Sequence, residues 1–287
     1  LSDGYHDIET VFEKIALYDR IFLKNSAKDE IIVRSSSKDA CFKGRDNTIY
    51  KAIALVKKRL KINRGVCVYL EKNIPIGAGL GGGSSDAVAA LKGLNKLWGL
   101  GLTRRMLLDF SEDLGSDMPL FVSEDSFLLG TGRGGLLSRV PGTKKLKLWH
   151  ILVVPNLKVS TPYAYSLFDS CFLGGKKPFQ ISQRPRKLRL TSHSYSANII
   201  LHALSSRDVA LLNYYSYNSF KGIILRRFTR LSSLYRKLEN INRGPVHLSG
   251  SGSALFMIFS NRKEAWYLVK KIEKSVKHCS VFLVHTR

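Results

Sequence analysis

Cysteine is scarce in this chain. Its 287 residues include four cysteines, which lie far apart in the sequence: Cys41, Cys67, Cys171 and Cys279. Because no two of them have the close spacing of zinc ligands or of a small disulfide framework, the sequence indicates neither kind of cross-link. Free thiols suit a reducing compartment, so we expect a cytoplasmic protein, or one of the plastid stroma if the source organism bears plastids.

Long apolar runs are also lacking. No stretch approaches the roughly 20 apolar residues that a membrane-spanning helix needs. The first residues are polar and include Asp3, His6 and Asp7, which is not the pattern of a secretory leader. We therefore expect no signal peptide and no association with a membrane.

Acidic residues are few relative to basic ones. Asp and Glu total 22 against 46 Lys and Arg, a formal net charge of +24, and residues 170–207 contain no acid. The basic residues of this segment are Lys176, Lys177, Arg184, Arg186, Lys187, Arg189 and Arg207. Such clusters can neutralise nucleic-acid phosphates, but no aromatic and basic RNA-binding signature accompanies them. A solvated basic loop is the simpler interpretation, and a positive field also favours small anionic substrates. We therefore expect no specific nucleic-acid partner, with RNA binding as the alternative.

The length of the chain and its 44% hydrophobic content allow two cores, so we expect two domains. A Pro-Gly-Thr-Lys-Lys turn at residues 141–145 is the predicted boundary. The predicted domains are therefore residues 1–145 and 146–287. Their oligomeric state does not follow from the sequence.

Hydrophobic periodicity predicts the secondary structure around this boundary. The predicted strands are Ile8–Leu23, Glu30–Ser35, Val66–Glu71, Ser126–Leu129, Leu146–Pro155 and Ala254–Phe259. The predicted helices are Asn47–Leu60, Thr103–Leu114, Pro162–Phe168, Asn198–Leu204, Gly222–Leu238 and one that follows a glycine-rich segment and includes Trp98.

That glycine-rich segment, Pro75–Ser85, is the most informative feature present, and we call it the glycine loop. It lies between a predicted strand and an amphipathic helix. Its five glycines lack the β-carbon that would keep the backbone away from an oxyanion, and they permit positive φ. They are Gly77, Gly79, Gly81, Gly82 and Gly83. We expect Ser84 or Ser85 to cap the helix, whose positive dipole end would then face a bound phosphate.

Three other interpretations of the glycine loop were weighed. A Walker loop needs Lys followed by Ser or Thr at its end, and no lysine stands there. A dinucleotide-binding fold needs a second strand after the helix, but a helical pattern follows Trp98. A turn that only lets a strand pack close to a helix is the remaining, purely structural alternative.

The glycine loop resembles the Pro-x-Gly-x-Gly-Leu-Gly-x-(Gly)-Ser-Ser segment with which the GHMP small-molecule kinases bind ATP. These kinases include galactokinase, homoserine kinase and mevalonate kinase. The resemblance implies an α+β fold with an N-terminal ribosomal-protein-S5-like ATP-binding domain and a C-terminal ferredoxin-like domain. It implies ATP as co-substrate, with Mg²⁺ as the default ion. The implied ATP-binding residues are Pro75, Ile76, Gly77, Ala78, Gly79, Leu80, Gly81, Gly82, Gly83, Ser84 and Ser85.

A more specific resemblance runs nearly from end to end. The chain is similar to the 4-diphosphocytidyl-2-C-methyl-D-erythritol kinase family in the order of its motifs. These are Asp3-Gly-Tyr-His-Asp7, Asp46-Asn47, the glycine loop, Leu114–Phe121, Val159-Ser-Thr-Pro162, Asn218 and Leu248-Ser-Gly-Ser-Gly252. The family resemblance implies ATP-dependent phosphorylation of the 2-hydroxyl of that acceptor, in non-mevalonate isoprenoid biosynthesis. The alternatives are a homoserine- or mevalonate-type kinase, or an inactive nucleotide- or RNA-binding relative.

The same resemblance implies roles for four residues. Asp117 corresponds to the catalytic base, although an aspartate in such a turn more commonly caps the next helix. Tyr5, His6 and Tyr165 correspond to residues that receive the cytidine end of the acceptor, since aromatic faces stack on a pyrimidine. No metal site made of protein side chains is expected.

The chain departs from the family pattern at three places. Gly135 stands where the family usually has Glu, and Ser219 stands where it has Asp. In the family a strand with Pro-x-Lys-x-Asn precedes the Asp-Gly-Tyr-His motif, but here Leu1 lies two residues before that motif. We therefore expect the sequence as given to lack the second catalytic residue, that lysine, and to be a poor kinase with an exposed sheet edge.

Overall fold

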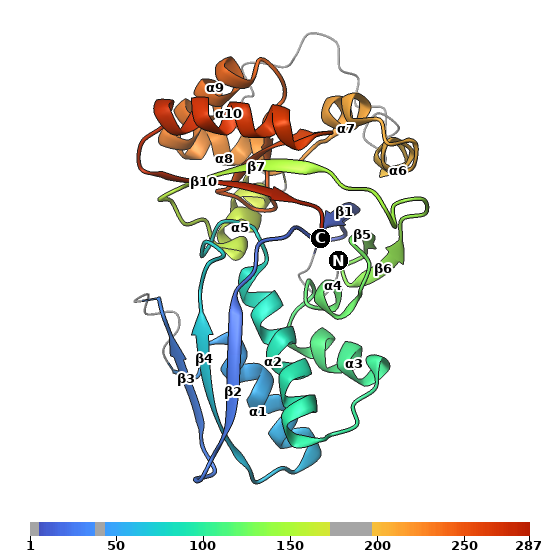
Figure 1. The fold of residues 1–287 in the computed structure, drawn as a ribbon, viewed down its shortest axis with the longest axis vertical. Helices are drawn as coiled ribbons and strands as arrows, with labels where there is room; N and C mark the ends of the chain where they lie inside the picture. Colours follow the sequence, from blue (N-terminus) through green and yellow to red (C-terminus); the bar gives the residue numbers. More distant parts are fainter. Residues whose placement is uncertain (1–5, 38–43, 173–196) are drawn as a thin grey trace. The chain divides into compact units, whose positions relative to one another are not determined.

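The computed structural model describes residues 6–37, 44–172 and 197–287, which form two compact units (Figure 1). The first unit takes the described residues within 1–13, 17–76 and 81–139, and the second takes 14–16, 77–80 and 140–287. The main break therefore follows Arg139, earlier than the boundary predicted at residue 145. The glycine loop is also divided, because residues 77–80 belong to the second unit.

The first unit contains a three-stranded sheet with the order β2-β4-β3. Its strands are β2 (Arg20–Ser26), β3 (Ile31–Ser35) and β4 (Gly65–Glu71). β4 pairs antiparallel with β2 and parallel with β3. Parallel pairing requires a crossover, which α1 (Thr48–Leu60) supplies between β3 and β4. Figure 1 shows α1 and α2 (Gly82–Trp98) on one side of this sheet.

The helices hold this sheet through an apolar core. Asn47 caps α1, since its Oδ1 accepts hydrogen bonds from the amides of Ile49 at 2.8 Å and Tyr50 at 3.4 Å. The predicted helix Asn47–Leu60 is confirmed in this form. The buried side chains Ile53 of α1 and Leu91 of α2 belong to one hydrophobic cluster. That cluster fixes α2, and with it the end of the glycine loop, against the sheet.

A second sheet of the first unit has the order β1-β5-β6 and is antiparallel. It is formed by β1 (Thr10–Glu13), β5 (Phe127–Thr131) and β6 (Leu136–Arg139). The single strand predicted for Ile8–Leu23 is wrong, because β1 and β2 lie in different sheets. Apolar alternation continues through both strands and cannot show that the pairing partner changes between them. The short helices α3 (Arg104–Leu114) and α4 (Pro119–Val122) precede β5.

The second unit is built on a four-stranded antiparallel sheet with the order β10-β7-β9-β8. Its strands are β7 (Trp149–Pro155), β8 (His247–Leu248), β9 (Leu255–Phe259) and β10 (Cys279–His285). The helices between β7 and β8 are α5 (Thr161–Phe172), α6 (Ala197–Ser206), α7 (Val209–Tyr215), α8 (Lys221–Arg227) and α9 (Thr229–Asn242). α10 (Arg262–Ser275) joins β9 to β10. This strand order is the ferredoxin-like one, and the predicted two-domain α+β fold is confirmed.

The helix predicted for Gly222–Leu238 is wrong in one respect. Phe228 has an extended backbone, with φ −116° and ψ 90°, and separates α8 from α9. Ile224 before the break and Leu231 and Leu238 after it are all buried in the core of the unit. The break lets two short helices present these side chains to the same core, which a periodic pattern alone does not reveal.

None of the helices in residues 6–37, 44–172 and 197–287 is long and apolar enough to cross a membrane. Of the predicted site residues, Tyr5 lies outside the described part of the chain. The basic residues from Lys176 to Arg189 also lie outside it. The structure therefore bears on the basic segment only at its two ends.

Candidate active site

The glycine loop has a left-handed backbone at three of its glycines. These are Gly77, Gly79 and Gly81, with φ of +65°, +73° and +66°. Positive φ is accessible to glycine at little cost. Gly82 and Gly83 instead form the first turn of α2, so the prediction of positive φ holds for three of the five.

The predicted serine cap of α2 is wrong. The N-cap position is occupied by Gly81, and Ser84 and Ser85 lie within the first turns of the helix. The left-handed conformation of Gly81 turns the chain into the helix before the serines are reached. Since Gly81 has no side chain to accept hydrogen bonds from the first amides of α2, these donors are suited to an anion from outside the helix.

The part of the loop in the second unit packs on another glycine turn, residues 249–253. Ser249 Oγ donates a hydrogen bond to the carbonyl of Gly79 at 2.8 Å, and the amide of Ala254 donates to the carbonyl of Ala78 at 3.0 Å. A β-carbon placed on Gly79 would lie 2.1 Å from the carbonyl oxygen of Ser249. Glycine is therefore required at position 79 by packing as well as by φ.

Asn218 holds that second turn. Its Nδ2 donates to the carbonyls of Leu248 and Gly250, both at 2.8 Å, and its Oδ1 accepts from the amide of Phe220 at 2.8 Å. The sequence identifies Asn218 as part of a family motif but predicts no physical role for its side chain. Both hydrogens of its amide group bond the turn on which Gly79 packs, and its amide oxygen ties that turn to the backbone at Phe220.

The part of the loop in the first unit meets the predicted base. Ser84 Oγ lies 2.9 Å from both Oδ1 and Oδ2 of Asp117. Asp117 is half-buried in the turn between α3 and α4. Its carboxylate therefore contacts the first turn of α2, 33 residues away in the sequence. This contact places a proton acceptor beside the amides that are available to an anion.

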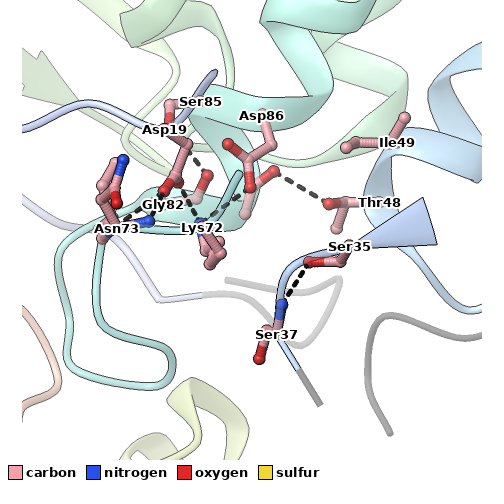
Figure 2. A network of polar contacts seen from close by, with 12 residues as sticks. Asp19, Ser35, Ser37, Thr48, Ile49, Lys72, Asn73, Gly82, Ser85 and Asp86 are labelled. Carbon is pink, nitrogen blue, oxygen red and sulfur yellow. Dashed lines mark hydrogen bonds and ion pairs between the residues drawn. The ribbon is translucent and has the colours of Figure 1, made fainter. Parts of the chain in front are cut away.

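Sequence reasoning missed a buried ionic group at the base of the glycine loop, shown in Figure 2. We call Lys72, Asp19 and Asp86 the Lys72 cluster. Lys72 Nζ donates to Asp19 Oδ2 and, at 2.9 Å, to Asp86 Oδ2. Only 5% of the Lys72 side chain is exposed, with 3% for Asp19 and 4% for Asp86. Lys72 lies shortly before the glycine loop, and Asp86 follows it directly. Their position beside the loop is the one feature of the sequence by which these two residues could have been found.

The Lys72 cluster contains two carboxylates and one ammonium. Burial raises the pKa of Asp86 to about 7, although the adjacent Lys72 acts to lower that pKa and Asp19 acts to raise it. One of the two negative charges is therefore only partly present near neutral pH.

The residues predicted to receive cytidine are placed as follows. His6 is half-exposed in the segment that leads into β1. Tyr165 lies on α5, and its ring meets that of Phe220 edge to face, with centroids 4.9 Å apart and an interplanar angle of 86°. Burial raises the pKa of the Tyr165 hydroxyl. The ring of Phe168 also meets that of Phe220, with centroids 6.0 Å apart. Tyr165 is therefore part of an aromatic cluster, and its stacking on the cytidine ring stays a prediction.

Gly135, which departs from the family pattern, lies close to the Asp117 turn. A β-carbon at Gly135 would be 3.3 Å from the carbonyl oxygen of Ser116. The glycine thus lets the chain after β5 approach the backbone next to Asp117. A larger residue would require that turn to shift by a few tenths of an ångström.

Comparison with known proteins identifies the family. Residues 47–124, which include α1, the glycine loop and Asp117, match the family described as the GHMP kinases N terminal domain. The 4-diphosphocytidyl-2-C-methyl-D-erythritol kinase of Thermodesulfovibrio yellowstonii is 34% identical over 95% of this chain and 88% of its own length. The kinase of the same name from Clostridioides difficile is 31% identical over 99% of this chain and 88% of its own. The chain belongs to the 4-diphosphocytidyl-2-C-methyl-D-erythritol kinase family. It is therefore a GHMP small-molecule kinase.

Solved structures agree with this assignment. A crystal structure of 4-(cytidine 5'-diphospho)-2C-methyl-D-erythritol kinase superimposes with a TM-score of 0.71 and 26% identity, over 99% of this chain and 92% of that one. Mevalonate kinase of L. major has a TM-score of 0.75 at 16% identity, covering 98% of this chain and 90% of its own. That second likeness shows the shared fold alone, so the homoserine- and mevalonate-type alternatives are less supported than the family itself.

Proposed function

We propose that this chain transfers the γ-phosphoryl group of ATP to the 2-hydroxyl of 4-diphosphocytidyl-2-C-methyl-D-erythritol, a step in the non-mevalonate route to isoprenoids. The acceptor is supported by the names of relatives that match nearly the whole chain. The chemistry is supported chiefly by one observation, the contact of Ser84 in the first turn of α2 with Asp117.

The glycine loop fits the phosphates of ATP. The first amides of α2 project from a helix whose dipole is positive at this end, and Gly82 and Gly83 carry no side chain beside them. A phosphate oxyanion would accept these hydrogen bonds, which neutralise charge as the γ-phosphoryl group moves. Pro75 and Ile76 form the start of this loop, a few residues after β4 ends at Glu71.

Mg²⁺ would accompany ATP, with phosphate oxygens as its ligands. Within the part of the chain that the structure describes, no group of three or more His, Cys, Asp or Glu side chains could hold a metal ion by itself. Mg²⁺ commonly keeps water and phosphate ligands, so the nucleotide would supply part of its coordination. Its role would be to neutralise charge on the phosphates.

Asp117 would act as the base that takes the proton of the attacking 2-hydroxyl. Its carboxylate accepts from Ser84, which holds the acid group next to the first turn of α2 where the γ-phosphate would lie. The hydroxyl oxygen then forms the new bond to phosphorus, and ADP leaves with the electron pair of the broken bond. His6, with Tyr5 and Tyr165, would contact the cytidine end, as the motifs predict.

A panel of hydroxyl acceptors tests this function. We expect ADP release from ATP to depend on 4-diphosphocytidyl-2-C-methyl-D-erythritol, with far lower rates on homoserine and mevalonate. The measurement is coupled detection of ADP at equal acceptor concentrations, with a control that lacks acceptor. Faster release with homoserine or mevalonate would assign the chain to another acceptor, and release that ignores the acceptor would reject transfer altogether.

A further inference from the structure

The Lys72 cluster occupies a specific position relative to the glycine loop. Lys72 immediately precedes the segment 73–85, and Asp86 immediately follows it. The ion pair between them, at 2.9 Å, therefore joins the two ends of that segment. A glycine-rich segment has many accessible backbone conformations, and fixing its ends reduces the number that it can adopt.

Asp19 adds backbone contacts to this closure. Its Oδ1 accepts hydrogen bonds from the amides of Asn73 at 2.5 Å and Ile74 at 2.8 Å, while its Oδ2 accepts from Lys72. Asn73 Nδ2 also donates to the carbonyl of Tyr18 at 3.0 Å. One carboxylate thus orients the two peptide groups that lead into Pro75, and Figure 2 shows it facing both Lys72 and Asn73.

The cluster also contacts the start of α2. A β-carbon at Gly82 would lie 2.9 Å from Lys72 Nζ and 2.9 Å from Ile74 Cγ2. Gly82 therefore makes room for the ammonium group beneath the first turn of the helix. On the far side of that turn, Thr48 Oγ1 donates to the carbonyl of Gly83 at 2.9 Å. The first turn of α2 is consequently held from two directions.

Burial of these charges is expensive unless they are paired, because the interior solvates ions poorly. A solvated surface pair at the same place would stabilise the fold about as well at lower cost in desolvation. The arrangement is accounted for if the charges are needed to hold a particular backbone geometry. Asp19 bonds both the ammonium and the two amides at the start of the segment 73–85, and Asp86 Oδ2 bonds the ammonium from the other end.

We propose that Lys72, Asp19 and Asp86 are positioning residues of the phosphate-binding loop, which set the first amides of α2 in the geometry that binds ATP without touching the nucleotide themselves. This inference rests on the proposed function of the glycine loop. It predicts that a substitution in the cluster weakens binding of ATP more than it raises the KM for the acceptor.

The first test compares two lysine substitutions in the same unit. Lys72→Met removes the ammonium of the cluster, whereas Lys57→Met removes a partly buried ammonium, which pairs with Asp29 and the carbonyl of Arg64 away from the loop. We expect Lys72→Met to weaken ATP binding, measured by calorimetry with Mg²⁺, on the order of 10²-fold if the amides are misplaced. The KM for the acceptor should change much less, and Lys57→Met should leave ATP affinity near that of the parent.

A second test avoids the risk that Lys72→Met does not fold. Asp86→Asn keeps the shape of the side chain and removes its charge. When Asp86 is ionised it forms the ion pair with Lys72 that joins the two ends of the segment 73–85, and when it is protonated this ion pair is lost. The ion pair that closes the segment is therefore fully formed only above the pKa of Asp86, which burial raises to about 7.

The expected result is a pH-dependent difference between the parent and Asp86→Asn. From about pH 6 to about pH 8 the parent should gain ATP affinity relative to the variant by several-fold, while the two should be similar at the lower pH. Because the parent and the variant are measured with the same ATP at each pH, the titration of ATP affects both affinities equally and does not alter their ratio. Burial is the main cause of the raised pKa of Asp86, and Lys72 and Asp19 are the charged groups that act on that pKa.

The outcomes separate this inference from the function on which it rests. Unchanged ATP affinity in folded Lys72→Met, an equal loss in Lys57→Met, or a pH-independent ratio of parent to Asp86→Asn affinities would each overturn it. If Lys72→Met and Asp86→Asn lose ATP affinity and Lys57→Met keeps it, but no acceptor is phosphorylated, the positioning role stands and the acceptor assignment fails.

Discussion

Replacing Asp117 by asparagine is expected to lower kcat on the order of 10²-fold or more. Asparagine has the same shape but cannot take a proton from the attacking hydroxyl. Ser84 can still donate to the side-chain oxygen, so the loop geometry at 2.9 Å should be retained. Steady-state kinetics should therefore show a large fall in kcat with little change in the KM for ATP.

Asp113→Asn is the matched control for this experiment. Asp113 lies near the end of α3 and pairs with Arg59, away from Ser84. Its side chain is well exposed, so loss of the charge should alter stability and activity little. A folded Asp117→Asn variant with the kcat of the parent would show that the contact with Ser84 is structural and that another group takes the proton.

Gly79→Ala is expected to destabilise the second unit by about 3 kcal/mol or more. Positive φ costs a residue with a side chain about 1 kcal/mol or more, and overpacking adds about 1 to 3 kcal/mol. At Gly79 both apply, because φ is +73° and the new methyl group would lie 2.1 Å from the carbonyl oxygen of Ser249. The midpoint of urea unfolding should fall accordingly.

Gly83→Ala provides a control within the same loop. Gly83 is helical, and a β-carbon there would meet only Thr48, at 3.6 and 3.9 Å. Alanine favours the helix over glycine by up to about 1 kcal/mol, so the variant should be as stable as the parent or slightly more stable. Equal unfolding midpoints for Gly79→Ala and Gly83→Ala would contradict the packing of residues 77–80 on the turn at 249–253.

Much of the fold could be predicted from the sequence because its signals are local. Asn47 is a good N-cap followed by apolar residues at helical spacing, and α1 begins where predicted. The family motifs, which are also local, brought Ser84 and Asp117 to attention before any contact was known. The fold that the motifs imply was correct in both units.

The remaining features depend on contacts between distant residues. Asp19 and Lys72 are 53 residues apart, and nothing in the pattern around Asp19 shows that its oxygens accept from the backbone before the glycine loop. The prediction of a serine cap was wrong because Gly81, in a left-handed conformation, begins α2 before Ser84 and Ser85 are reached. Asn218 likewise holds its turn through the carbonyls of Leu248 and Gly250, 30 and 32 residues later. Pairing across such distances is set by tertiary packing, which local propensity does not encode.

Phosphorus NMR of the reaction products tests the central claim most directly. The chain would be incubated with ATP, Mg²⁺ and 4-diphosphocytidyl-2-C-methyl-D-erythritol, and the products followed over time. The account predicts a new phosphate monoester on the 2-hydroxyl of the acceptor, formed in equal amount to ADP and slowed strongly in Asp117→Asn. ADP that appears with inorganic phosphate and no ester, or an ester on a different hydroxyl, would contradict it.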